Sequence, residues 1–105
     1  MRSMERTAES LARTETELRA EKAAALARIA GTLEGLLAEL RRRRESFGGL
    51  PSEERDPAVG AYDALREQAR LYCWYLVVQR EALGLFRHDD VDRHYPLPEP
   101  LSPHH

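Results

Sequence analysis

Hydrophobic residues recur at helical spacing over two long stretches of the chain, which a short segment with glycine and proline separates. The first stretch, residues 3–47, contains no proline and is dense in Ala, Leu, Glu and Arg, which all favour helix. Its leucines follow one another at spacings of three, four and seven, so they share one face of a helix. Gly48, Gly49 and Pro51 end this pattern. We therefore expect one long helix over about residues 3–47.

The second stretch begins with Asp56 and Pro57, an N-cap residue followed by a residue suited to the first helical position. It predicts a helix over about residues 56–87. Its inner face carries Val59, Tyr62, Leu65, Ala69, Tyr72, Leu76, Leu83 and Phe86. Because the connection is short, the two helices are expected to lie antiparallel. The predicted fold is all-α, with a long two-helix hairpin over residues 1–87 and a separate C-terminal segment over residues 88–105.

The C-terminal segment changes in character along its length. Residues 89–94 suit one short helical turn. The four prolines between residues 96 and 103 then exclude helix and favour an extended, polyproline-like arm, here called the arm (residues 95–105). An arm that is already extended loses little conformational entropy on docking, so we expect it to bind a partner. Its candidate binding residues are Tyr95, Pro96, Leu97, Pro98, Pro100 and Leu101.

The eight residues Leu71–Val78 are all apolar, so this part of the second helix is hydrophobic on every side. A helix of this kind is normally buried, and a two-helix hairpin buries only one of its sides. The opposite side forms an outer stripe, made of Leu71, Trp74, Val78 and Leu85. We expect a homodimer that covers this stripe and forms a coiled-coil-like four-helix bundle. A constitutive partner protein, or the arm folding back through Tyr95, Leu97 and Leu101, accounts for the same stripe.

The first helix carries two interior glycines, Gly31 and Gly35, on the side away from its leucines. Each glycine in an exposed helix interior costs about 1 kcal/mol relative to alanine. Small residues at helical spacing allow another helix to approach closely. These two residues, the glycine face, are therefore a second candidate interface. The alternative for the alanines on this side, Ala20, Ala24, Ala27 and Ala38, is that they are ordinary surface helix formers, but this does not account for the glycines.

Arg80 lies on the inner side of the second helix, where an apolar residue is expected. A buried arginine requires a carboxylate partner, and such pairs fix the register between helices. Glutamates in range are Glu81 and those near the start of the first helix: Glu15, Glu17 and Glu21. The alternative is an arginine whose head group reaches water.

Composition and net charge argue against several classes of function. The net charge is −2, which gives no general attraction to nucleic acid or anionic membranes, and no apolar run approaches the ~20 residues of a membrane span. There is one cysteine, and no secretory leader is apparent, so we expect a cytoplasmic protein without disulfides. No cofactor or metal is expected.

Three motifs are candidates for a binding or catalytic site, and for each of them a purely structural role is the alternative. Arg41–Arg44 resembles a nucleic-acid patch, but four successive helical positions spread around the helix, and a helix C-terminus favours positive charge. His88–His94 holds five potential metal ligands without a known loop spacing. Cys73 lies in the apolar run, with no base nearby in the sequence. The sequence therefore favours a non-enzymatic, cytoplasmic protein–protein interaction module. A nucleic-acid-binding protein or a helical bundle that binds a small ligand or metal is the alternative.

Overall fold

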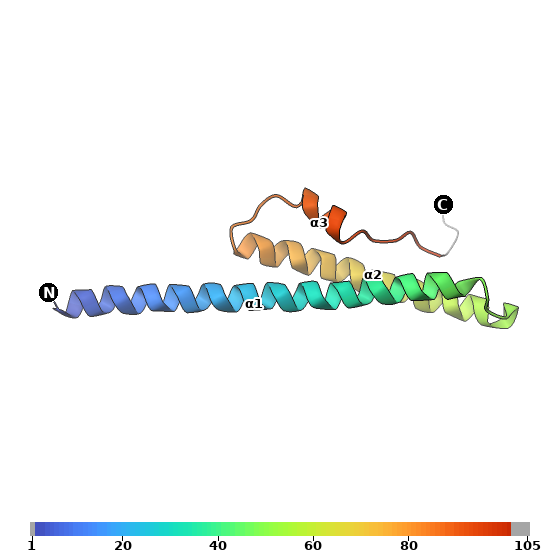
Figure 1. Ribbon diagram of the computed structural model, residues 1–105, viewed down its shortest axis with the longest axis horizontal. Coiled ribbons are helices and arrows are strands. Elements are labelled where there is room, and N and C mark those ends of the chain that lie inside the picture. The colour runs from blue at the N-terminus through green and yellow to red at the C-terminus, as the bar shows by residue number, and fades with distance from the viewer. Residues whose placement is uncertain (1, 102–105) are drawn as a thin grey trace.

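The computed structural model describes residues 2–101, with the side chains of residues 4–101, and the regular secondary structure of these residues is helix without any strand. Three helices follow one another along the chain: α1 (Arg2–Phe47), α2 (Ser52–Ala82) and α3 (Asp89–His94). Figure 1 shows α1 and α2 lying antiparallel, with α3 and the arm, as far as Leu101, running back along them. The two predicted long helices are therefore present, and the all-α class is confirmed.

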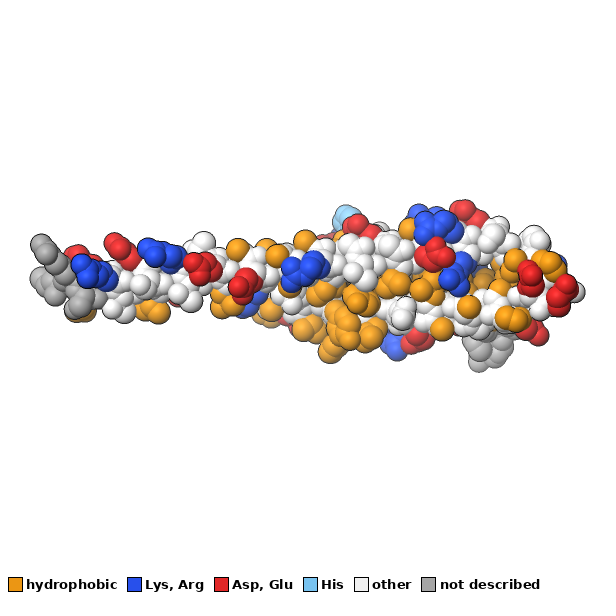
Figure 2. Space-filling model, turned by 90° about the horizontal axis from the view of Figure 1, so that it is seen from below, with side chains coloured by type: hydrophobic (Ala, Val, Ile, Leu, Met, Phe, Trp, Pro, Cys, Tyr) orange, Lys and Arg blue, Asp and Glu red, His pale blue; other side chains and the backbone are white. Residues whose placement is uncertain are grey.

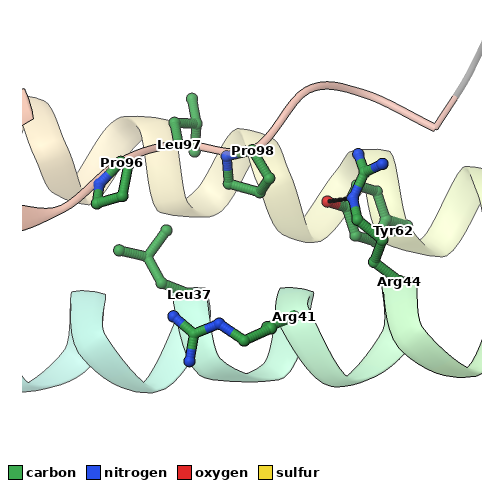
Figure 3. A pocket seen from close by; sticks show the side chains of 7 residues that line it. All are labelled: Leu37, Arg41, Arg44, Tyr62, Pro96, Leu97 and Pro98. Atoms are coloured by element: carbon green, nitrogen blue, oxygen red, sulfur yellow. Dashed lines mark hydrogen bonds between the residues drawn. The ribbon is translucent and has the colours of Figure 1, made fainter.

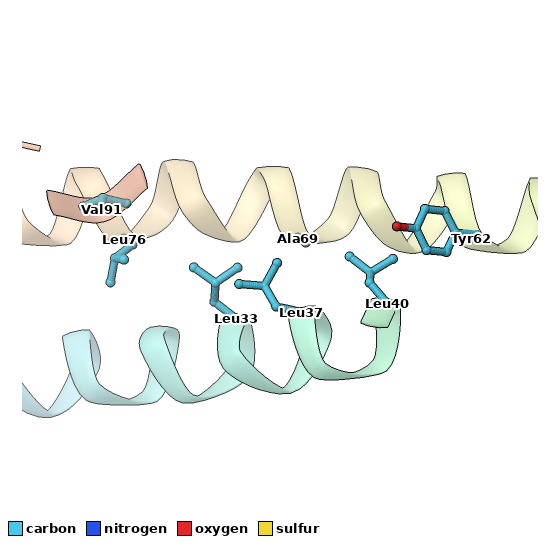
Figure 4. Packing of buried hydrophobic residues seen from close by; sticks show 7 residues of the cluster. All are labelled: Leu33, Leu37, Leu40, Tyr62, Ala69, Leu76 and Val91. Atoms are coloured by element: carbon cyan, nitrogen blue, oxygen red, sulfur yellow. The ribbon is translucent and has the colours of Figure 1, made fainter. Parts of the chain in front are cut away.

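The core lies along the seam between α1 and α2. Leu33 and Leu40 of α1 are fully buried, as are Tyr62 and Ala69 of α2. Figure 4 shows these side chains pointing toward one another across the seam, with Val91 of α3 above it. The leucine spacing in α1 thus produces the predicted stripe, and α2 covers it.

The helix α2 begins four residues earlier than the Asp56 and Pro57 signal suggested. It starts at Ser52 and continues through Pro57. The hydrogen bond that Pro57 lacks would reach the carbonyl of Glu53, which lies in the exposed first turn, where water can serve the same group. A proline this close to a helix start therefore does not force a new helix.

The helix α2 also ends earlier than predicted, at Ala82 rather than at residue 87. Gly84 adopts a positive φ of 85°. Its N–H donates to the carbonyl of Glu81, and the N–H of Leu85 donates to the carbonyl of Arg80, both at 2.9 Å. This pair of bonds is the Schellman arrangement that closes a helix. The predicted extension through Phe86 is therefore wrong, and Gly84 was the signal that marked the end.

Polar contacts fix where α2 stops along α1. The amino group of Lys22 donates to the carbonyl of Ala82 at 3.3 Å, and the Gln79 amide donates to the carbonyl of Lys22 at 3.2 Å. Residues of α1 before Lys22 therefore extend beyond α2. We call residues 2–21 the overhang, and Figure 1 shows it as the isolated N-terminal part of α1.

The overhang makes the molecule long and thin. The principal extents are 77 × 21 × 16 Å, and the radius of gyration is 20.6 Å. A compact domain of this length has a radius of gyration of roughly 13 Å. The single chain therefore exposes much of its surface.

Candidate interaction surfaces

The outer stripe of α2 is exposed in the single chain. The exposed fractions are 46% for Leu71, 60% for Trp74 and 43% for Val78. Each of these residues lies two positions from buried Ala69 or Leu76, and two positions turn a helix by about 200°. The stripe therefore faces away from α1. Figure 2 shows hydrophobic side chains gathered over the C-terminal half of α2, along one edge of the molecule.

The fourth predicted member of the outer stripe, Leu85, lies after the end of α2. It is 46% exposed, and neighbouring Phe86 is more exposed still. Because α2 ends at Ala82, Leu85 does not continue the helical stripe as predicted. The helical part of the stripe therefore ends at Val78.

Aromatic side chains lie next to one another at the outer stripe. The rings of Trp74 and Tyr75 have centroids 5.7 Å apart, and those of Tyr72 and Tyr75 are 5.3 Å apart in an edge-to-face arrangement. Tyr72 also packs against the core. Large aromatic side chains held by their neighbours are the kind of residue that dominates protein interfaces.

The glycine face lies on the side of α1 away from α2. Gly31 and Gly35 lie two positions before and after fully buried Leu33, so the same 200° rotation turns them outward. A methyl group built on either glycine meets nothing within 4 Å. The glycine face and the outer stripe therefore look in opposite directions, and one two-fold contact can bury only one of them.

The arm does not cover the outer stripe. The structure describes it as far as Leu101, and its predicted continuation to Pro103 lies outside the described residues. Tyr95, Leu97 and Leu101 pack against the core cluster, while the outer stripe stays exposed. The arm therefore folds back on the hairpin, as one alternative predicted. It covers the core seam, however, and not the outer stripe.

Three hydrogen bonds tie the backbone of the arm to the hairpin. The Arg66 guanidinium donates to the carbonyl of Pro98 at 2.6 Å, and that of Arg44 donates to the carbonyl of Glu99. The N–H of Leu101 donates to the Asp63 carboxylate at 3.0 Å. The arm therefore lies in a groove with donors and acceptors already in place.

The start of the arm is held as well. The Tyr95 side chain is partly buried against the core and lies beside Glu34. Burial, followed by the Glu34 carboxylate, raises the pKa of the Tyr95 hydroxyl. The hydroxyl therefore stays protonated beside the Glu34 carboxylate.

A cavity of about 250 Å³ lies between the arm and the hairpin. Figure 3 shows the rings of Pro96 and Pro98 on the side of the arm facing Leu37, with Arg44 reaching up to Tyr62. The Arg44 guanidinium donates to the Tyr62 hydroxyl at 3.2 Å and lies 5.3 Å from the centre of its ring. Arg41 also lines the cavity and makes no hydrogen bond or ion pair within the described residues. The cavity is therefore positively charged on one wall and apolar on the other.

Arg80 pairs with a carboxylate, but not with one of the glutamates that the sequence suggested. Its guanidinium donates to Asp90 at 3.0 Å and to the carbonyl of Arg87 at 2.9 Å. The Arg80 side chain is 19% exposed, so the pair is half-buried rather than fully buried. It joins α2 to α3 instead of fixing the register between the long helices. Sequence reasoning missed Asp90 because only the fold-back after Gly84 brings it near.

The arginine cluster Arg41–Arg44 is mostly engaged within the chain. Arg42 and Arg43 both bind Glu39, at 2.6 and 3.0 Å, and both lower the pKa of that carboxyl. Arg44 is bound to Tyr62 and to the arm. Of the four guanidinium groups, Arg41 alone is left unengaged within residues 4–101, which weakens the reading as a nucleic-acid patch.

Most of the candidate metal ligands in the segment His88–His94 are engaged with other residues of the chain. Asp90 binds Arg80, Asp89 binds Arg93 at 3.2 Å, and His88 lies 3.3 Å from Glu81. Over the described part of the chain, no three His, Cys, Asp or Glu side chains converge as a metal site requires. The structure therefore offers no support for the metal-binding alternative.

Cys73 is partly buried beside the core. Burial, and then the Asp92 carboxylate, raises the pKa of its thiol. A reactive cysteine needs the opposite shift. The environment of Cys73 is therefore that of a packing residue.

Comparison with protein-family models, with curated proteins and with solved structures finds no match for this chain. Within the described residues, neither long helix has an apolar stretch sufficient to cross a bilayer.

Proposed function

We propose that this chain is a non-enzymatic, cytoplasmic protein–protein interaction module that forms a homodimer through the outer stripe of α2. Two hairpins meeting along this stripe form a four-helix bundle. The observation that carries the proposal is the exposure of Leu71, Trp74 and Val78, which together form an apolar face that no other described residue covers fully. Contiguous apolar faces of this kind mark interaction sites.

The total surface supports the same proposal. The chain exposes 7936 Å², whereas a compact monomer of 12.0 kDa exposes roughly 6,000 Å². A standard interface removes roughly 800 Å² from each partner. The excess surface therefore leaves room for a self-contact as well as a further partner.

A two-fold contact through α2 assigns roles to the remaining surfaces. The glycine face points outward on the far side of each hairpin, so it is not part of this dimer. The overhang stays available, with exposed Met4, Leu11 and Leu18 along one side. The arm remains the candidate partner-binding element, and it reaches a partner in full only after release from the hairpin.

Trp74 is the sole tryptophan, so its fluorescence reports on the proposed contact directly. In the dimer the ring is buried, and we expect blue-shifted emission and weak quenching by acrylamide. On dilution both should move toward the values of an exposed indole. Leu71→Glu should give exposed-indole values at every concentration, whereas Gln68→Glu, which adds the same charge at another exposed position of α2, should behave as the wild type. An exposed, freely quenched Trp74 at high wild-type concentration would contradict the proposal.

A further inference from the structure

The groove beneath the arm directs its hydrogen bonds to backbone atoms, while Leu97 and Leu101 of the arm pack against the core. Arg66 and Arg44 donate to the carbonyls of Pro98 and Glu99, and Asp63 accepts from the N–H of Leu101. Every arm atom in these three bonds belongs to the main chain. Recognition of this kind tolerates different side chains, because any extended segment presents the same groups at the same spacing.

Proline suits such a groove for two reasons. A prolyl segment is already extended, so little conformational entropy is lost on docking. Proline also lacks an N–H, and two guanidinium groups facing the segment need only acceptors. The order of the contacts, with both cationic donors before the Asp63 acceptor along the arm, fixes the direction in which the segment lies.

The arm fills this groove incompletely. The cavity of about 250 Å³ remains between its prolines and the wall formed by Leu37, Arg41 and Tyr62. Arg41 lines that cavity without a partner among the described residues. The cavity is partly open to solvent, and a ligand side chain that displaces its water gains an ion pair if it reaches Arg41. A segment with a larger or acidic side chain at the position of Pro96 or Pro98 therefore fits the groove better than the arm does.

We propose that this groove binds an extended, proline-containing segment of another protein, and that the arm is an internal competitor for it. The expected ligand has apolar residues at the positions of Leu97 and Leu101 and an acidic residue facing Arg41. The inference rests on the proposed role as an interaction module, but not on the dimer. Partner capture is then regulated by release of the arm.

The test uses the full chain with the arm weakened by Leu97→Asp and Leu101→Asp, and a fluorescent peptide with the sequence of residues 95–101. The variant should bind the peptide saturably. The wild type should bind it roughly tenfold or more weakly, because a tethered arm competes at an effective concentration on the order of 1 mM. Two controls should abolish binding: the same two substitutions in the peptide, and Arg66→Gln in the arm-weakened chain. Equal binding by both chains, or no saturable binding by a folded variant, would overturn the proposal.

A second measurement covers the case in which the arm-weakened variant does not fold. Hydrogen exchange of the Leu101 amide, which donates to Asp63, should accelerate in the wild type when the peptide is present in large excess, because the arm is displaced. Unchanged exchange at saturating peptide would overturn the inference.

The experiments also separate the groove from the dimer and from arm exchange. Peptide binding repeated in a Trp74→Glu chain should be unchanged, even though the dimer is lost. A dimer that survives Trp74→Glu but dissociates when Leu97→Asp and Leu101→Asp are added would mean that a second copy's arm fills the groove. That outcome would overturn the assignment of the groove to another protein.

Discussion

At the scale of single residues, Arg80 shows how a polar side chain acquires a role from a distant part of the chain. Its Nη2 atom donates both to the Asp90 carboxylate and to the carbonyl of Arg87. Its Nε atom is buried and has no hydrogen-bond partner. The guanidinium therefore closes the loop after α2, with one donor left unsatisfied.

We expect Arg80→Ala to lower the free energy of unfolding by about 1–3 kcal/mol, since two charge-assisted hydrogen bonds are lost. Asp90→Ala should cost less, and the double variant should cost less than the two changes summed. Urea unfolding followed by circular dichroism measures all three. Arg70→Ala is the matched control, because its pair with Glu67 is exposed and contributes little. A loss for Arg80→Ala no greater than the control's would contradict the anchoring role.

Cys73 provides a prediction about pH. Because burial raises the pKa of its thiol, the reactive thiolate is scarcer at neutral pH than for a free cysteine. Alkylation by iodoacetamide should therefore be slow, and its rate should rise with pH through a midpoint above that of the unfolded chain in urea. A midpoint at or below the unfolded value would show that Cys73 is an activated thiol.

At the scale of elements, the end of α2 decides what the rest of the chain can do. Gly84 turns the backbone at a φ of 85°, and the chain then leads into α3 and the arm. Val91 is buried as a result, and the arm lies along the hairpin.

Gly84→Ala should destabilise the chain by about 1 kcal/mol, because a side chain is strained at this φ. Nothing lies within 4 Å of the added methyl group, so the cost is conformational and not steric. Thermal unfolding measures it. A neutral effect would mean that the turn after α2 is not fixed in the folded chain.

The same substitution within α1 should have the opposite sign. Gly31→Ala and Gly35→Ala add a methyl group in open space, in a helix interior. Each should stabilise the chain by about 0.5–1 kcal/mol, without a change in solution mass. Altered mass would instead show that the glycine face, as the sequence suggested, is a contact surface.

The sequence predicted some elements of the fold better than others. The leucine spacing in α1 is periodic over many turns, so it predicted that helix and its buried side. The predicted start of α2 was too late because Pro57 suggested a first helical position. The predicted end was too late because the hydrophobic pattern was continued through Leu83 and Phe86, past Gly84. The arm's position was left open because its contacts to Arg44, Asp63 and Arg66 join residues that are far apart in sequence. Pairings between distant segments leave no local pattern to detect.

At the scale of the whole molecule, the central feature is one hairpin with too much surface for a single chain. The core occupies only the stretch where α2 covers α1, and the arm covers one further side of it. The outer stripe remains as the largest uncovered aromatic and aliphatic face of α2. In the proposed homodimer, a second copy covers this face without any additional component.

Solution mass by light scattering, taken over a range of protein concentrations, tests the self-contact most directly. We expect the wild type at twice 12.0 kDa. Trp74→Glu should give 12.0 kDa with an unchanged helical circular dichroism spectrum, because it places a charge in the middle of the contact and leaves the core intact. Gln68→Glu should remain dimeric. A wild type at 12.0 kDa across all concentrations, or a Trp74→Glu chain with the wild-type dimer mass, would contradict a homodimer formed through the outer stripe.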